Sequence, residues 1–156
     1  MNEELSLLAR AIGLEQAEHE ALRLAFGLAC VERVQHLLED DGAVRCLAVL
    51  REHVAGRASR AELAAAEREI AQIANQHRGS RSLDGAAHAA VSATYAVSKA
   101  LAGRALDAAS YAAYATVYAY GGYAVNDRSS FEPEFAWQVE SLRALASKAK
   151  DGAATA

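Results

Sequence analysis

The scarcity of helix-breaking residues is the feature that most constrains the fold of this chain. Its 156 residues include a single proline, Pro133, and ten glycines, the two residue types that a helix interior tolerates least. No alternating run of β-branched residues bounded by turn residues occurs in the sequence, so no strand is predicted. Because 53% of the residues are hydrophobic, the chain can bury a substantial core. We therefore expect one all-α domain over residues 1–150 and a frayed tail over 151–156.

Apolar residues at helical spacing predict six or seven helices, packed as antiparallel hairpins into a single bundle. The predicted helices span residues 3–12, 15–39, 44–54, 59–77, 84–102, 105–125 and 132–148. Ser59 and Glu62 form a capping box that marks the start of the fourth helix, and Gly103 is the break between the two alanine-rich helices. No repeat of fixed period supports an α-solenoid, which is the second choice.

Three consecutive acids, Glu39, Asp40 and Asp41, are expected to end the long second helix. They would lie at the negative end of its dipole, and Gly42 would let the chain turn. The first 41 residues hold nine acids against three bases, whereas residues 42–128 hold seven acids against ten bases. Two interpretations stay open for this acidic turn: a solvated charge cluster, or a surface that attracts a basic partner.

Composition also indicates which cellular roles to expect. The net charge of −4 is opposite to the basic character of proteins that bind nucleic acids, so no nucleic-acid partner is expected. Cys30 and Cys46 do not form a Cys-x-x-Cys pair, which argues against a zinc site or a disulfide framework. The acidic N-terminus and the lack of a 20-residue apolar run predict neither a signal peptide nor a membrane partner. A cytoplasmic protein is expected.

No motif in the sequence predicts a reaction, so we expect no enzyme, no cofactor and no metal. Two acid–histidine pairs, Glu15 with His19 and Glu32 with His36, have the spacing that puts them side by side on a helix. They are interpreted as solvated pairs, with a metal site as the lesser alternative. Both cysteines lie within hydrophobic helix patterns and are interpreted as core residues rather than nucleophiles.

Five of the six tyrosines fall between positions 111 and 123, which is the most unusual feature of the chain. Tyr111, Tyr114 and Tyr118 follow one helical stripe, which favours packing against a neighbouring helix. Tyr120 and Tyr123 point elsewhere and precede a polar loop that contains Asp127. Because tyrosine is enriched in binding hot spots, we predict that these three residues, together with the acidic turn, bind a protein partner.

A different class of function also fits the same region. His88 lies in the first alanine-rich helix, and the six tyrosines lie between positions 95 and 123. These side chains could line a pocket in a small ligand-binding bundle or enzyme. A third alternative is an oligomerising module in which the alanine stripes form the subunit interface. Whatever the function, a homodimer is the expected oligomeric state, because homodimers are common.

Several segments resemble the Imm5-like immunity proteins of bacterial polymorphic toxin systems. The resemblance rests on residues 29–34 (ACVERV), on the alanine-rich segments 85–90 and 112–119, and on residues 137–142 (WQVESL), and it runs in order over residues 22–146. It implies an all-helical cytoplasmic protein, without catalytic residues, that binds and neutralises a cognate protein toxin. Family members favour histidines in the second alanine-rich helix, where this chain has tyrosines, so no histidine role is transferred.

Overall fold

A computed structural model describes residues 1–76 and 86–155, which form seven α-helices and four short 3₁₀ helices. The α-helices are α1 (Glu3–Ile12), α2 (Glu20–Glu32), α3 (Asp41–Val54), α4 (Arg60–Asn75), α5 (Ala86–Leu101), α6 (Ala105–Tyr120) and α7 (Glu132–Thr155). The 3₁₀ helices are η1 (Ala17–His19), η2 (Gln35–Leu37), η3 (Gly122–Asn126) and η4 (Arg128–Phe131). The described part of the chain contains no strand, which confirms the predicted all-α class.

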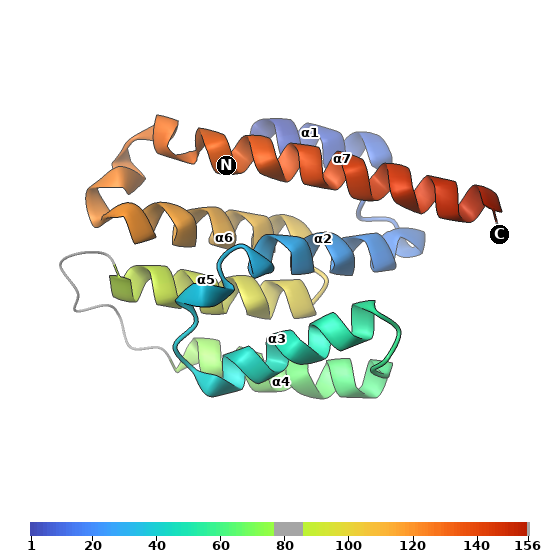
Figure 1. Ribbon diagram of the computed structural model, residues 1–156, viewed down its shortest axis with the longest axis horizontal. Helices are drawn as coiled ribbons and strands as arrows, with labels where there is room; N and C mark the ends of the chain where they lie inside the picture. The colour runs from blue at the N-terminus through green and yellow to red at the C-terminus, as the bar shows by residue number, and fades with distance from the viewer. Residues whose placement is uncertain (77–85, 156) are drawn as a thin grey trace.

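The helices form one bundle in which α2 is central. Figure 1 shows α1 beside α7 at one side, the α3–α4 hairpin at the other, and α2, α5 and α6 between them. Helix α2 packs against α3, α5, α6 and α7. In an α-solenoid each unit contacts only its neighbours in sequence, so the contacts of α1 with α7 and of α2 with α6 identify a bundle instead.

Local sequence signals account for several helix ends. The Ser59 hydroxyl accepts from the Glu62 amide at 3.1 Å, and the Glu62 carboxylate accepts from the Ser59 amide at 2.6 Å, which confirms the predicted capping box. Gly13 ends α1 in the left-handed region with a φ of 68°, and Gly103 does so between α5 and α6 with a φ of 73°. This conformation favours glycine at both positions.

The predicted helix over residues 15–39 is wrong. The structure divides this segment into η1, α2, a turn at Arg33 and Val34, and η2. Asp40 adopts an extended conformation and accepts hydrogen bonds from the amides of Gly42 and Ala43 at 2.7 and 3.3 Å. It is therefore the N-cap of α3, and the acidic turn lies at the positive end of that helix dipole rather than at the negative end of α2.

The last two predicted helices also have different ends. Helix α6 stops at Tyr120, and residues 122–126 form η3 rather than a continuation. Helix α7 continues past the predicted end at Lys148 to Thr155, so the tail predicted to fray lies mostly within a helix, and its fraying stays a prediction. The predicted start of the fifth helix, at residue 84, lies outside the described residues.

Small side chains let the central helices approach closely. Ala93, Ala100, Ala108 and Ala112 are all fully buried where α5 and α6 pack. Gly27 of α2 is also buried: a Cβ atom built there would lie 3.2 Å from Ala100 Cβ and 3.3 Å from Ala100 Cα. The spacing between α2 and α5 therefore depends on a residue without a side chain.

We predict that Gly27→Leu destabilises the protein by about 1–3 kcal/mol, because the new side chain overpacks the α2–α5 contact. The matched control is Ala48→Leu, which adds the same side chain at an exposed position of α3 and should change stability by no more than about 0.5 kcal/mol. Urea denaturation of both variants measures the difference. An equal free energy of unfolding for the two variants would contradict the close contact between Gly27 and Ala100.

Candidate functional site

An ion pair between a partly exposed guanidinium and a buried carboxylate joins the end of α2 to the start of α7. The Arg33 guanidinium donates to the two Glu134 carboxylate oxygens at distances of 2.8–3.1 Å, and Glu134 is only 3% exposed. The hydrogen bond with Glu134 raises the pKa of Arg33 above its ordinary value. The guanidinium also lies 4.1 Å from the centroid of the Trp137 ring, a favourable cation–π contact. Arg33 is therefore held by two partners on α7.

Gln138 continues this polar cluster into the core. Its side chain is fully buried, and its amide nitrogen donates to the Ala109 carbonyl of α6 at 2.8 Å. Its amide oxygen accepts from the Asn2 side chain at 3.1 Å, and Asn2 in turn caps α1 through the Leu5 amide. One buried glutamine thus links α1, α6 and α7 and satisfies its own hydrogen-bonding groups, as burial requires.

A cleft of about 290 Å³ lies beside the Arg33–Glu134 pair. Its walls come from the end of α2, from η2, from the last two turns of α6 and from α7, and the residues that line it are Arg33, His36, Leu37, Thr116, Ala119, Tyr120 and Glu134. Tyr120, predicted to bind a partner, stands at the edge of this cleft and is 71% exposed.

Tyr123 and Asp127, the other residues predicted in this region, lie on the segment after α6. Tyr123 belongs to η3 and is 80% exposed. A Cβ atom built at Gly121 would lie 2.6 Å from Cε1 of Tyr123, so the tyrosine ring sits directly against this glycine. Asp127 accepts from the Ser129 hydroxyl at 2.8 Å and from its amide at 3.0 Å. These bonds lower the pKa of Asp127 and indicate a capping role.

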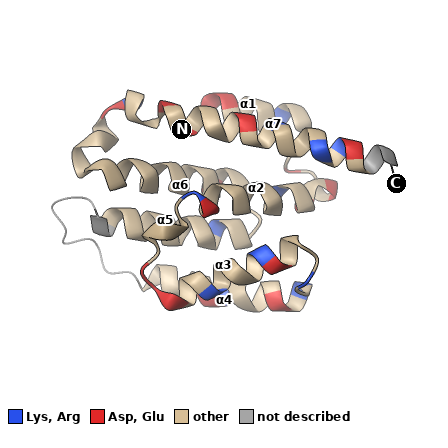
Figure 2. Ribbon diagram, viewed as in Figure 1, with Lys and Arg blue, Asp and Glu red and all other residues tan. Residues whose placement is uncertain are grey.

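The acidic turn begins two residues after η2, which forms one wall of the cleft. Figure 2 shows its acids where the chain enters α3. Asp40 is used as the cap of α3, whereas Glu39 and Asp41 are exposed and make no ion pair within the residues that the structure describes. Two of the three carboxylates thus face solvent unpaired.

The tyrosine stripe of α6 packs against its neighbours, as one of the two interpretations expected. Tyr111 stacks on Tyr95 of α5 with ring centroids 5.3 Å apart, and Tyr118 stacks on His88 at 5.1 Å. Tyr114 meets the Phe131 ring edge-on at 5.2 Å. The alternative pocket lined by His88 and tyrosines stays a prediction.

The two acid–histidine pairs are not neighbours on a helix. Glu15 precedes η1, while Nδ1 of His19 lies 2.7 Å from the Gly13 carbonyl oxygen. Glu32 ends α2 and pairs at 3.5 Å with Arg51 of α3 rather than with His36 of η2. Within the described ranges no three histidine, cysteine, aspartate or glutamate side chains converge as metal ligands would.

Both cysteines are free and buried, as predicted. Burial raises the pKa of Cys46 to about 11 and raises that of Cys30 further. The nearby Glu134 carboxylate adds to the shift of Cys30. A thiol reacts as the thiolate, so burial disfavours the reactive form of both side chains.

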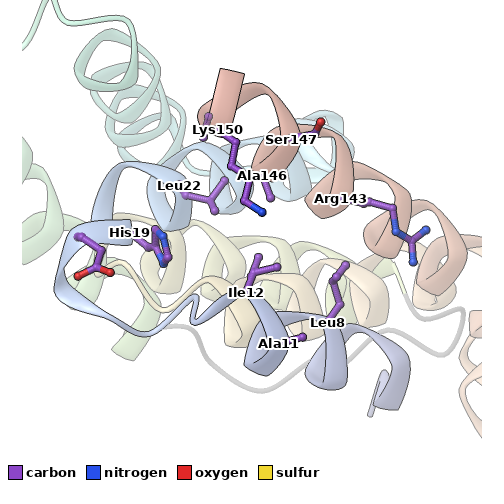
Figure 3. Close-up of a pocket in the computed structure, with 11 residues that line it drawn as sticks. Leu8, Ala11, Ile12, His19, Leu22, Arg143, Ala146, Ser147 and Lys150 are labelled. Carbon is purple, nitrogen blue, oxygen red and sulfur yellow. The ribbon is translucent and has the colours of Figure 1, made fainter. Parts of the chain in front are cut away.

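A second and larger cleft, of about 700 Å³, lies between α1, α2 and α7 (Figure 3). This cleft could not be predicted from the sequence, because its lining comes from both ends of the chain. The contacts of Arg33, Glu134 and Gln138 were not predicted either. One local signal was present, since Gln138 follows Phe135 at i+3 and precedes Leu142 at i+4, which places a polar side chain on the apolar face of α7.

We predict that Arg33→Met destabilises the protein by about 3–5 kcal/mol, because it leaves the buried Glu134 carboxylate without a partner. The double variant Arg33→Met with Glu134→Met removes both charges and should be more stable than the single variant. Arg45→Met, which breaks an exposed pair with Glu69, is the control and should cost no more than about 1 kcal/mol. Chemical denaturation measures all three, and a double variant less stable than Arg33→Met would contradict the argument.

We also predict that both thiols are protected in the folded protein. At pH 8 each pKa lies above the pH, so the thiolate is the minor form and is shielded from reagent. Labelling with 5,5′-dithiobis(2-nitrobenzoic acid) should be negligible in buffer and should reach two thiols per chain in guanidinium chloride. Rapid labelling of either cysteine in the folded protein would contradict the burial.

Comparison with known proteins identifies no relative of this chain. No protein-family model, no curated protein and no solved structure matches the chain. No helix among the described residues is both long enough and apolar enough to span a membrane. The membership in the Imm5-like immunity proteins therefore stays a prediction from the residues that carry the resemblance.

Proposed function

We propose that this protein is an immunity protein that binds a cognate toxin in the cytoplasm and blocks it without catalysis. The binding surface comprises the two exposed tyrosines, Tyr120 and Tyr123, and the acidic turn of Glu39, Asp40 and Asp41. The single observation that carries the proposal is the high exposure of both tyrosines, 71% and 80%, at one end of the bundle. Tyrosine side chains lose little conformational entropy on binding and supply a large contact area.

The positions of the two tyrosines support a role as rigid anchors. Tyr120 is in the last turn of α6 and borders the cleft whose wall contains the Arg33–Glu134 pair. Tyr123 lies two residues after Gly121, which has a φ of 146° and lies against the tyrosine ring. An anchor that is already ordered costs less free energy to immobilise on binding.

Charge supports a basic partner. The exposed carboxylates of Glu39 and Asp41 follow η2, which lines the same cleft as Tyr120. Unpaired surface acids accelerate the encounter with a positively charged protein and make the association sensitive to salt. Asp127 adds a negative charge four residues after Tyr123, between η3 and η4. Its Oδ1 atom also caps η4.

The direct test is binding of the purified polypeptide encoded by the neighbouring gene, measured by pull-down and then by calorimetry. We expect Tyr120→Ala and Tyr123→Ala each to weaken binding about 30-fold, the effect typical of a hot spot. Leu7→Ala is the matched control, because Leu7 is 64% exposed on α1 and lies outside the proposed surface. The combined Glu39→Gln and Asp41→Asn variant should slow association and reduce its salt dependence.

Two results would overturn the proposal. The first is failure of the neighbouring polypeptide to bind the folded wild-type protein at low salt. The second is binding that survives the two tyrosine substitutions as well as it survives Leu7→Ala. Circular dichroism of each variant ensures that a loss of binding is not a loss of folding.

A further inference from the structure

The 700 Å³ cleft between α1, α2 and α7 has a mainly apolar floor. Leu8 and Ile12 come from α1, Leu22 from α2 and Ala146 from α7. Clefts of roughly 300–1,000 Å³ with this kind of lining are typical of small-molecule sites. The part of α7 that lines the cleft is its C-terminal half, whereas Tyr120 ends α6 and Tyr123 belongs to η3, and neither tyrosine lines the cleft.

Of the three formally charged side chains that line the cleft, two are basic and one is acidic. Arg143 and Lys150 of α7 line it together with Glu18 and His19, in a chain whose net charge is −4. Arg143 already pairs with Glu140 at 2.6 Å. Lys150 makes no ion pair within the residues that the structure describes. Among the described residues Lys150 is thus a cation at the cleft without an acidic partner, and Glu18, which lines the same cleft, makes no ion pair either.

The position of Lys150 relative to the apolar floor is the decisive feature. Figure 3 shows its side chain extending from α7 toward the middle of the cleft, between Leu22 and Ile12. His19 lies at the same end, with its ring orientation set by the 2.7 Å contact between Nδ1 and the Gly13 carbonyl oxygen. This arrangement suits a ligand with an anionic head group and a hydrocarbon chain. The ammonium group would pair with the anion, and the apolar side chains would contact the hydrocarbon.

We propose that this cleft binds an aliphatic monocarboxylate. The hydrocarbon chain lies along Leu8, Ile12 and Leu22, and the carboxylate pairs with the ammonium group of Lys150. A cationic amphiphile would meet Lys150 as a like charge, and a neutral one would leave it without a partner. This proposal does not depend on the proposed immunity function, because the two use separate parts of the surface.

The test is isothermal titration calorimetry of the whole protein with hexanoate, octanoate and decanoate below their micelle concentrations. We expect a single site per chain, and affinity that rises about tenfold for each two added methylene groups as they are buried. Lys150→Gln should weaken decanoate binding about tenfold, as expected for the loss of a charged hydrogen bond. Lys150→Arg should retain most of the affinity.

The matched control is Lys148→Gln, which removes the same charge from an exposed position of α7 that does not line the cleft. It should bind decanoate like the wild type. Decan-1-ol and decylamine are the ligand controls and should bind more weakly than decanoate. Absence of saturable decanoate binding, equal binding of decylamine, or equal affinity of the Lys150→Gln and Lys148→Gln variants would each overturn the proposal.

Discussion

The contact between Gly27 and Ala100 is the constraint on which the arrangement of the bundle depends. Because Gly27 has no side chain, the backbone of α2 lies directly against Ala100 of α5. Helix α2 also packs against α3, α6 and α7. The alanines of α5 and α6 extend the same principle, since small side chains allow two helices to bury their surfaces with few voids. Larger residues at these positions would push α2 outward and would separate the α1–α7 layer from the α3–α4 hairpin.

Polar contacts then fix how α7 lies on this core. The Arg33–Glu134 pair joins α7 to the end of α2, and Gln138 joins it to α6 and to the cap of α1. Buried charges and amides are costly unless every partner is in place, so these bonds favour one position of α7. Both clefts described above have α7 as a wall, and their shapes follow from that position.

The sequence predicted the elements whose signals are local. The Ser59 capping box and the break at Gly103 need only a few neighbouring residues, and the structure confirms both. The division of the segment 15–39 could not be predicted in this way, because no glycine or proline marks the turn after Glu32. Nor does hydrophobic periodicity reveal that Asp40 caps the amides of Gly42 and Ala43. The Arg33–Glu134 pair spans 101 positions, and only the tertiary fold brings it together.

Several residues of the segments that resemble the Imm5-like immunity proteins are buried or contact other residues of this chain. Cys30 and Val31 are buried, Glu32 pairs with Arg51, and Arg33 contacts both Glu134 and Trp137. Two of the segments that carry the resemblance, residues 29–34 and 137–142, therefore meet where Arg33 contacts Trp137.

A resemblance built on such residues bears on how the helices pack rather than on what the protein binds. Recognition of a particular partner requires side chains that the fold leaves exposed, and Tyr120 and Tyr123 meet this requirement. They also lie outside residues 29–34 and 137–142. Proteins that share this core could therefore differ at the end of α6 and bind different partners, since specificity depends on surface residues that packing does not constrain.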